Sequence, residues 1–166
     1  DFYLTRAQRT ALAQTVHPLL QTRGVPGTHD VALALSVLSA LQRGKPVKLP
    51  RFDKAQDDRV AENEWPSILQ PVDIILVEGW CVGALPQTAE TLQWPLNELE
   101  SNEDPQGIWR RYVNDKLATG YQELFAMLDV LVMLNVPSFD KVYAWRALQE
   151  SRLQRRMSDE QLRRFV

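Results

Sequence analysis

Apolar residues recur at helical spacing near the start of the chain. Thr5 and Gln8 have the spacing of a capping box, in which each side chain bonds the backbone amide of the other residue. Apolar side chains follow at intervals of three or four residues, as on one face of a helix. The pattern predicts a short amphipathic helix over residues 5–16, which Pro18 ends.

The next helical pattern is apolar around most of its circumference. Asp30 stands at the N-cap position of a helix over residues 31–43, and Gly44 stands where a C-terminal glycine belongs. A helix with apolar residues on several sides is covered by other elements. We therefore expect this helix to lie in the core.

Two continuous apolar runs have the composition of buried strands. They are residues 72–80, VDIILVEGW, and residues 129–137, DVLVMLNVP, and a shorter candidate, VKLP, occupies residues 47–50. Runs without polar alternation, separated by a long helical segment, indicate a parallel sheet that is buried on both faces. The predicted fold class is α/β, with helices on both faces of the sheet.

Helical segments separate and follow the two runs. Asp104 and Pro105 are the residue types of an N-cap and a first helical position, and Gly120 is expected to kink or divide the helix that they begin. Ser138 is expected to cap a further helix, and Ser158 to begin a final one with a capping box. The chain thus alternates strands and helices, as α/β proteins do.

Composition sets outer limits on the function. The chain has 166 residues, 45% of them hydrophobic, which is enough for one domain with a core over residues 1–166. Its formal charge of −2 gives no general attraction to nucleic acid or to an anionic membrane. The single cysteine, Cys81, and the lack of a signal-like or long apolar segment indicate a reducing, cytoplasmic setting. Because the sequence starts and stops inside predicted elements, we expect a domain truncated at both ends.

The carboxyl ends of the predicted strands are the places to look for a ligand site, because α/β proteins bind ligands there. Glu78 ends the 72–77 run and Gly79 follows it. A carboxylate at this place can hold Mg²⁺, which needs one or two protein oxygens besides phosphate and water. Capping of the next turn explains Glu78 equally well.

Charged residues of both signs follow the 47–50 candidate strand. Asp53, Lys54 and Arg59 lie in a loop that alternates acids and bases, which can bind hydroxyls and carboxylates together. A solvated charged loop is the simpler interpretation of this stretch taken alone.

The loop over residues 22–30, TRGVPGTHD, which we call the opening loop, has the composition of an anion-binding junction. Its glycines allow a ligand to approach the backbone, and Arg23 offers a two-pronged donor for a carboxylate. His29 and Asp30 can bond hydroxyls at the start of the following helix. A tight structural connection is the alternative.

Arginines are frequent toward the C-terminus. Arg146 and Arg152 lie on a basic helical stretch, where they could clamp transferring phosphates as part of a lid or lie on a solvated face. The chain contains no GxxxxGK[ST] motif, so these residues alone cannot form a complete nucleotide site.

Several motifs together resemble one enzyme family. They are DFYLT at the start, TRGVPGTHDVALALSVL, KLPRFDKAQDDR, VDIILVEGWCVG, RRYVNDKL and, at the end, MSDEQLRRFV. In this order they resemble the D-glycerate 3-kinase family, P-loop kinases related in fold to uridine kinase, phosphoribulokinase and pantothenate kinase. The resemblance implies a P-loop NTPase-like, three-layer α/β/α fold with a mostly parallel sheet, whose first strand and P-loop precede this chain.

The resemblance also implies an activity and roles for residues. The activity is transfer of a phosphoryl group from ATP, with Mg²⁺, to a small hydroxy acid such as D-glycerate, without nucleic-acid or membrane partners. Asp1 matches the segment whose aspartate serves the attacking hydroxyl as base, and Glu78 matches the acidic residue that supports Mg²⁺. The implied acceptor-binding residues are Arg23, His29, Asp30, Asp53, Lys54 and Arg59, and the lid residues are Arg146, also catalytic, and Arg152.

Departures from the family pattern leave alternatives open. A glycine-containing hinge expected before MSDEQ is absent, so either the lid is shorter or a loop near residues 156–157 is missing. A related kinase for a nucleoside, pantothenate or another hydroxy acid is one alternative. A non-catalytic P-loop relative that binds nucleotide or a partner protein is another. The sequence does not determine the oligomeric state.

Overall fold

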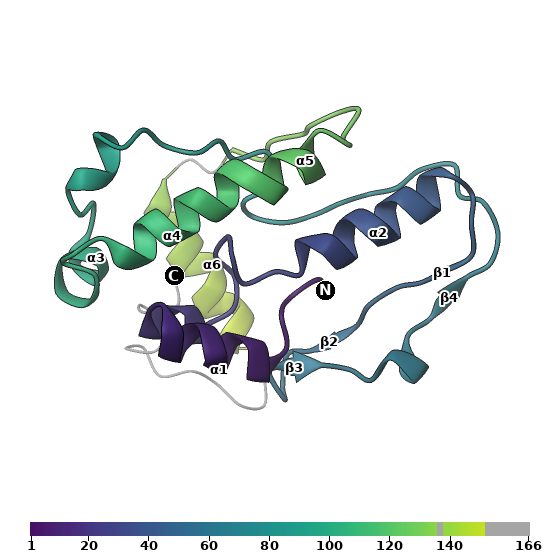
Figure 1. Ribbon diagram of the computed structural model, residues 1–166, viewed down its shortest axis with the longest axis horizontal. Coiled ribbons are helices and arrows are strands. Elements are labelled where there is room, and N and C mark those ends of the chain that lie inside the picture. The colour runs from purple at the N-terminus through teal and green to yellow at the C-terminus, as the bar shows by residue number, and fades with distance from the viewer. Residues whose placement is uncertain (136–137, 152–166) are drawn as a thin grey trace. The chain divides into compact units, whose positions relative to one another are not determined.

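The computed structural model describes residues 1–135 and 138–151 (Figure 1). The chain divides into two compact units, Asp1–Asp129 and Val130–Val166, and each is described by itself. The first unit carries most of the elements and every residue of the site built below.

The first helix, α1, spans Arg6–Thr15 and begins with the predicted capping box. Thr5 Oγ1 accepts a hydrogen bond from the Gln8 amide at 3.3 Å, and Gln8 Oε1 accepts one from the Thr5 amide at 2.8 Å. A 3₁₀ turn, Pro18–Gln21, follows the end of the helix. The predicted start and end of this helix are confirmed.

The second helix, α2, spans Val31–Gln42 and packs against the segment that includes Tyr121 (Figure 1). Asp30 is its N-cap, because Asp30 Oδ1 accepts a hydrogen bond from the Leu33 amide at 3.0 Å. Gly44 follows the helix with a φ of +62°. The expectation of a core helix is confirmed by its buried side chains, which join other apolar groups in the core: Leu20, Ala34, Val37, Leu38, Leu117 and Tyr121.

The strands in the described part of the chain form two short antiparallel ladders. In the first, β1, Val47–Lys48, pairs with β4, Ser67–Ile68. In the second, β2, Phe52–Asp53, pairs with β3, Asp58–Arg59, so the charged loop is a hairpin. A 3₁₀ turn, Glu62–Glu64, lies between β3 and β4. The predicted strand over 47–50 is thus confirmed in part.

The two apolar runs do not form the predicted buried parallel sheet. Residues 72–80 and 129–135 are irregular and pair with no other segment among the residues described, while residues 136–137 lie outside them. Leu76 is 91% exposed and Leu134 is 87% exposed. A strand buried on both faces needs a neighbouring strand to bond its backbone and a helix to cover each face. The apolar pattern of a run does not show whether these neighbours are present.

The helical region after the first apolar run is more divided than predicted. It consists of a 3₁₀ turn, Thr91–Gln93, then α3, Glu98–Glu103, and α4, Ile108–Lys116. Asp104 is not the N-cap of α4, because Gly107 takes that place with a left-handed φ of +68°. The Asp104 carboxylate nevertheless accepts hydrogen bonds from the first-turn amides of Trp109 and Arg110 at 3.0 and 3.1 Å.

A π-helical segment, Leu117–Tyr121, joins α4 to α5, Gln122–Phe125. Thr119 has non-helical dihedral angles, with φ −110° and ψ −110°, so the predicted interruption at Gly120 is confirmed. Gly120, within this π-helical segment, faces Val31 of α2. A Cβ added at Gly120 would lie 3.3 Å from Val31 Cγ1.

In the second unit, α6 spans Phe139–Ser151, in agreement with the helix expected after Ser138. The final helix expected from Ser158 lies outside the described residues. No helix within the described ranges is long and apolar enough to cross a membrane.

Candidate active site

The opening loop is held in place by the N-terminal residues of the chain. The Leu4 amide donates a hydrogen bond to the Thr28 carbonyl at 2.9 Å, and the Asp30 amide donates one to the Phe2 carbonyl at 2.7 Å. Between these bonds Tyr3 and His29 form an antiparallel bridge, and their rings stack with centroids 5.0 Å apart. Residues 2–4 therefore lie directly beside the end of the opening loop.

Gly27 brings the backbone of the opening loop close to the long helical region. It has a φ of +97°, and its amide donates a hydrogen bond to Tyr121 Oη at 2.9 Å. A Cβ added at Gly27 would lie 2.7 Å from Tyr112 Cε1. The position requires glycine for two reasons, the dihedral angle and the lack of space.

His29 and Tyr121 form a partly buried polar pair at the end of the opening loop. His29 Nδ1 lies 2.7 Å from Tyr121 Oη. Burial lowers the pKa of His29 to about 4. Burial also raises the pKa of the Tyr121 phenol above its usual range. Both side chains are therefore neutral at pH 7, and their contact fixes the loop without a charge.

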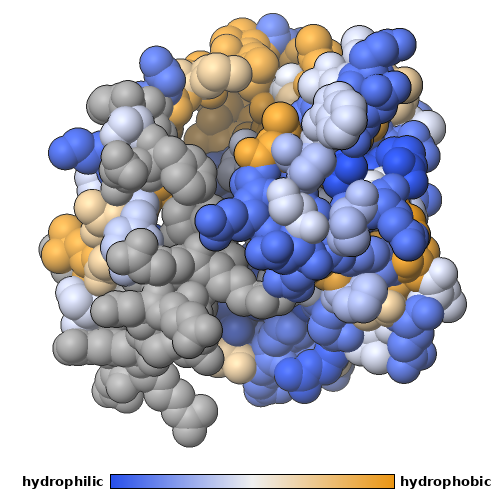
Figure 2. All heavy atoms as spheres, turned by 90° about the vertical axis from the view of Figure 1, so that its left-hand side faces the viewer, coloured by the Kyte–Doolittle hydropathy of each residue, from blue (hydrophilic) through white to orange (hydrophobic). Residues whose placement is uncertain are grey.

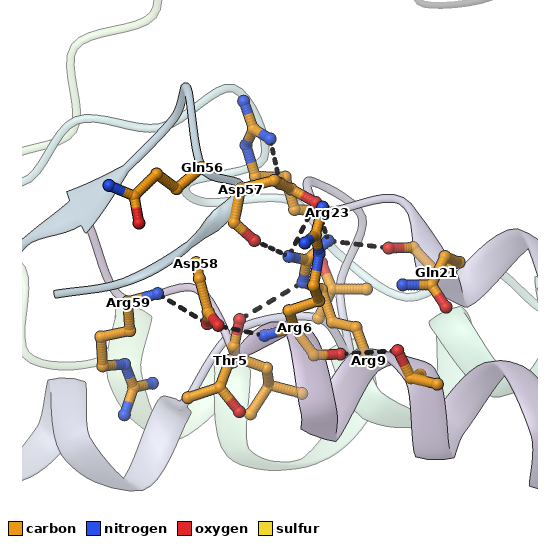
Figure 3. A network of polar contacts seen from close by, with 12 residues as sticks. Thr5, Arg6, Arg9, Gln21, Arg23, Gln56, Asp57, Asp58 and Arg59 are labelled. Carbon is orange, nitrogen blue, oxygen red and sulfur yellow. Dashed lines mark hydrogen bonds and ion pairs between the residues drawn. The ribbon is translucent and has the colours of Figure 1, made fainter.

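Arg23 reaches across to the tip of the β2–β3 hairpin. Its Nη1 pairs with Asp57 Oδ1, and Asp57 Oδ2 lies 3.0 Å from the guanidinium of Arg9. Figure 3 shows the guanidinium groups of Arg9 and Arg23 beside the Asp57 carboxylate, while Asp58 turns to the start of α1. One carboxylate is thus shared between two arginines from different elements.

Asp30 and Arg59, both expected to bind the acceptor, bond to each other. Arg59 Nη2 lies 3.1 Å from Asp30 Oδ2 and donates a hydrogen bond to the Tyr3 carbonyl at 2.7 Å. The other oxygen of Asp30 caps α2. In this structure the two side chains tie the hairpin, the N-terminal segment and α2 together.

Asp53 and Lys54 lie at the turn of the same hairpin. Asp53 Oδ1 accepts hydrogen bonds from the amides of Ala55 and Gln56 at 2.8 and 3.1 Å, which shapes the turn. Lys54 is exposed. Its positive charge lies close enough to Asp1 to interact with it electrostatically.

Glu78 and Asp1 are brought to the same region through Trp80. Trp80 Nε1 donates a hydrogen bond to the Gly24 carbonyl at 2.8 Å, which places residues 78–80 beside the opening loop. The Glu78 carboxylate lies close enough to Asp1 to interact with it electrostatically. Asp1 Oδ2 accepts a hydrogen bond from the Phe52 amide at 3.4 Å. The candidates from the N-terminus, the opening loop, the hairpin and the first apolar run therefore converge.

The arginines expected in a lid lie after Asp129, outside the first unit. Arg146 lies on α6 in the second unit, where its Nη1 donates a hydrogen bond to Gln149 Oε1 at 2.7 Å. Arg152 lies outside the described residues. A further arginine, Arg110 of α4, is buried and pairs with Asp104, with Nη1 3.3 Å from Oδ2.

The donor groups available to a metal ion are few. Across residues 1–135 and 138–151, no three His, Cys, Asp or Glu side chains form a group that could hold a metal. Glu78 is an exposed carboxylate, which meets the modest demand of an Mg²⁺ ion that keeps most of its water and binds phosphate. Burial raises the pKa of the Cys81 thiol, which makes it a poor ligand or nucleophile at pH 7.

Two cavities flank the opening loop. One, of about 510 Å³, lies between α1 and the α4–π region and includes Gly27, His29 and Tyr121 in its lining. The other, of about 240 Å³, includes Val25, Trp80 and Trp109. Figure 2 looks onto the side of the molecule that holds α3 and shows apolar side chains around a hollow near the top.

Four residues that shape the site were not expected from the sequence. Arg9 is completely buried, Asp57 is the only non-glycine residue with positive φ among the residues described, and Tyr121 and Trp80 hold the opening loop. Arg9 lies on an amphipathic helix, and an arginine in such a sequence pattern is expected at the surface. No local signal links it to Asp57, because the two are 48 positions apart.

Comparison with known proteins shows which kinases this chain is similar to. No protein-family model matches the chain. It is 35% identical to the "Uncharacterized kinase mug58" of Schizosaccharomyces pombe, 32% to the "D-glycerate 3-kinase, chloroplastic" of Arabidopsis thaliana and 32% to the "Probable ATP-dependent kinase TDA10" of Saccharomyces cerevisiae. Each alignment covers the whole chain. The resemblance to the D-glycerate 3-kinase family is confirmed.

The fold agrees with this family. The structure superposes on a D-glycerate 3-kinase from Cryptococcus neoformans with a TM-score of 0.82 and 28% identity, over 99% of this chain and 62% of that one. The chain spans 64%, 37% and 60% of the lengths of the three relatives named above. The chain is therefore related to kinases with an α/β fold. These kinases also contain residues that have no counterpart in the chain.

Proposed function

We propose that the protein containing this chain is an ATP-dependent kinase that phosphorylates a small hydroxy acid, most simply D-glycerate. The observation that carries the proposal is the convergence of four separate segments around Arg23, namely the N-terminal residues, the opening loop, the β2–β3 hairpin and residues 78–80. Relatives named as D-glycerate 3-kinases support the choice of acceptor, and a relative named as an ATP-dependent kinase supports the donor.

Arg23 is the group proposed to recognise the acceptor's carboxylate. Its side chain is 23% exposed, and Nη1 is the only one of its nitrogens with a hydrogen bond among the residues described. A guanidinium presents a second pair of donors, Nε and Nη2, in the geometry that a carboxylate matches. His29 in the opening loop, and Asp53 and Lys54 on the adjoining hairpin, are the polar groups proposed to bind the hydroxyls. Asp30 and Arg59 contribute by fixing the loop.

Asp1 and Glu78 are proposed to serve the transfer step. Phosphoryl transfer needs a base or orienting group for the attacking hydroxyl and neutralisation of the charge that spreads over the phosphoryl oxygens. The Asp1 carboxylate lies at the Phe52 amide and can accept the hydroxyl proton. Glu78 would hold Mg²⁺ through water, and the ion would supply the neutralising charge. Arg146 and Arg152 remain proposed lid residues.

The complete sheet is proposed to include residues of the protein outside 1–166. The exposed runs at 72–77 and 130–134 are too apolar to remain in water, and they align with a kinase of which this chain covers 62%. A three-layer arrangement with a P-loop in the added part would cover both runs. It would also supply the phosphate-binding loop that these residues lack.

A coupled ADP-release assay on the whole protein tests this function. The acceptors are D-glycerate, L-glycerate, glycerol, pantothenate and uridine, each with ATP and Mg²⁺. We expect kcat/KM for D-glycerate to exceed that for glycerol at least about tenfold, because glycerol lacks the carboxylate that Arg23 binds. Turnover of uridine or pantothenate in preference to D-glycerate would assign the protein to a related kinase. ATP binding without turnover of any acceptor would indicate a non-catalytic relative.

A further inference from the structure

The Asp57 carboxylate occupies an unusual position at the tip of the β2–β3 hairpin. Asp57 has a φ of +55°, a left-handed conformation that side-chain-bearing residues adopt uncommonly and that aspartate and asparagine tolerate best. Its Oδ2 faces Arg9 and its Oδ1 faces Arg23. A conformation of this kind persists where surrounding contacts determine it, so the contacts of Asp57 are the place to seek its role.

Arg9 holds Asp57 through both its carboxylate and its backbone carbonyl. The Arg9 side chain is 0% exposed and donates hydrogen bonds to the Leu4 and Gln21 carbonyls at 3.3 and 2.7 Å. It also bonds the Asp57 carbonyl at 2.6 Å, in addition to the carboxylate. Asp57 is the acid that pairs with this buried cation, so the carboxylate cannot turn away without leaving Arg9 uncompensated.

Arg23 is fixed in turn by Asp57. Besides the ion pair, its guanidinium lies over the rings of Phe52 and Tyr3, with its carbon 5.4 and 5.9 Å from the ring centroids. Nε and Nη2 make no hydrogen bond within the part of the chain that the structure describes. The contact through Nη1 therefore determines where the remaining donor edge of Arg23 lies.

We infer that Asp57 is a positioning residue, which holds Arg23 so that its Nε and Nη2 edge is available to the carboxylate of the acceptor. This inference rests on the proposed function, because it concerns the same site. Asp57 touches neither acceptor nor nucleotide in this scheme and acts only through Arg23. Arg9 thus holds Asp57, and Asp57 holds Arg23. In this way a buried residue of α1 affects which acceptor the site recognises.

An opposite role for Asp57 predicts an opposite result. If Asp57 merely occupied Arg23 until the acceptor displaced it, removal of its charge would free Arg23 and lower the KM for the acid. The contacts with Arg9 argue against displacement, because they hold both the backbone and the carboxylate of Asp57. The sign of the change in KM therefore separates positioning from competition.

The variant Asp57→Asn tests the inference in the whole protein, with Asp58→Asn as the matched control. Asparagine keeps the shape of the side chain and tolerates the left-handed conformation. Asp58 is the adjacent residue, but its carboxylate accepts hydrogen bonds from the backbone amides of Arg6 and Arg59, each at 2.8 Å. For Asp57→Asn we expect the KM for D-glycerate to rise about tenfold, with kcat and the KM for ATP within about twofold of wild type.

The control variant Asp58→Asn and the uncharged acceptor glycerol show which results would contradict the inference. Asp58→Asn is expected to leave the KM for D-glycerate within about twofold, and the KM for glycerol is expected to change little in either variant. An unchanged or lowered KM for D-glycerate in folded Asp57→Asn would overturn the inference. An equal rise for glycerol and D-glycerate would also overturn it, because positioning of Arg23 affects the carboxylate alone.

Asp57→Glu keeps the test decisive if Asp57→Asn does not fold. Glutamate preserves the charge beside Arg9 but places the carboxylate about one methylene farther out, so Arg23 is displaced. We expect a raised KM for D-glycerate again, whereas a purely charge-balancing role for Asp57 leaves this KM unchanged and contradicts the inference.

A spectroscopic measurement separates this inference from the proposed function. The NMR signal of the Arg23 Nε–H group, recorded without substrate, reports the order of the guanidinium. We expect a sharp signal in wild type and a broadened one in folded Asp57→Asn, even if wild type phosphorylates no hydroxy acid. Identical signals in the two proteins would refute the positioning role, whereas failure of the acceptor assay alone would refute the proposed function.

Discussion

His29 carries little charge at physiological pH because the protein encloses it. Its neighbours are the Tyr121 hydroxyl at 2.7 Å and the stacked Tyr3 ring, and no carboxylate forms an ion pair with it among the residues described. Burial lowers its pKa from 6.5 to about 4. A proton that binds His29 in the unfolded chain near pH 6 is therefore excluded from the folded chain.

This exclusion predicts a loss of stability in mild acid. The folded pKa lies below the unfolded one, so the contribution is fully present above pH 6.5 and disappears as the pH falls toward 4. We expect the free energy of unfolding, from urea titrations at pH 7 and pH 4.5, to fall by about 2 kcal/mol through His29. In His29→Gln this part of the pH dependence should vanish.

His17→Gln is the control for this measurement, because His17 is the other histidine of the chain and caps the 3₁₀ turn Pro18–Gln21 instead of lying in the opening loop. Its variant should retain the loss between pH 7 and pH 4.5. If His29→Gln shows the same pH dependence as wild type, protonation of His29 is not what destabilises the fold in acid.

Single residues differ in how far the sequence reveals them. The caps at Thr5 and Asp30 follow from neighbours within three positions, so their roles were predictable. The pair of Arg9 and Asp57 depends on a hairpin that returns 48 residues later, and no periodicity shows it. Charged residues that pair inside the structure look the same in a sequence as charged residues that bind a ligand.

At the scale of elements, the opening loop and the α4–π region are fitted to each other. Gly27 packs against Tyr112, and its amide bonds Tyr121, the last residue of the π-helical segment. The π segment places Tyr121 where it meets both Gly27 and His29. A regular α-helix would rotate this side chain away, because each residue of a helix turns by about 100°.

Gly27→Ala tests this fit. Alanine would have to adopt the left-handed φ of +97°, and its methyl group would lie 2.7 Å from Tyr112 Cε1. We therefore expect the free energy of unfolding to fall by about 3 kcal/mol. Gly24→Ala is the control, because φ there is +132° but the side-chain atom nearest to an added Cβ, Trp80 Nε1, is 3.9 Å away. The control should lose clearly less, about 1 kcal/mol. Equal losses from urea denaturation would mean that the contact with Tyr112 is unimportant.

The helices were more predictable than the strands for a physical reason. A helix satisfies its backbone internally, so local caps and an apolar face define α1 and α2. The runs at 72–80 and 129–137 have the composition of buried strands, but a strand becomes regular only when another segment bonds to it. Two short ladders, β1–β4 and β2–β3, are what the described residues supply.

At the scale of the whole molecule, the related kinases contain residues that this chain does not match. The chain covers 62% of the solved D-glycerate 3-kinase, and its exposed apolar runs need cover. The segments that we propose to bind the acceptor lie within residues 1–80, and the hydrogen bonds that join them lie there too, apart from the support of Tyr121. The resemblance predicted the segments that meet, whereas the partners inside the cluster became visible only in the structure.

The central claim is that Arg23 recognises the carboxylate of a small hydroxy acid, and the variant Arg23→Lys tests it most directly. Lysine keeps the charge but lacks the second donor edge, so we expect the KM for D-glycerate in the whole protein to rise about tenfold or more while the KM for ATP stays within about twofold. Arg43→Lys, an exposed position at the end of α2, should change neither. A KM for D-glycerate that is the same in Arg23→Lys as in wild type would contradict the account.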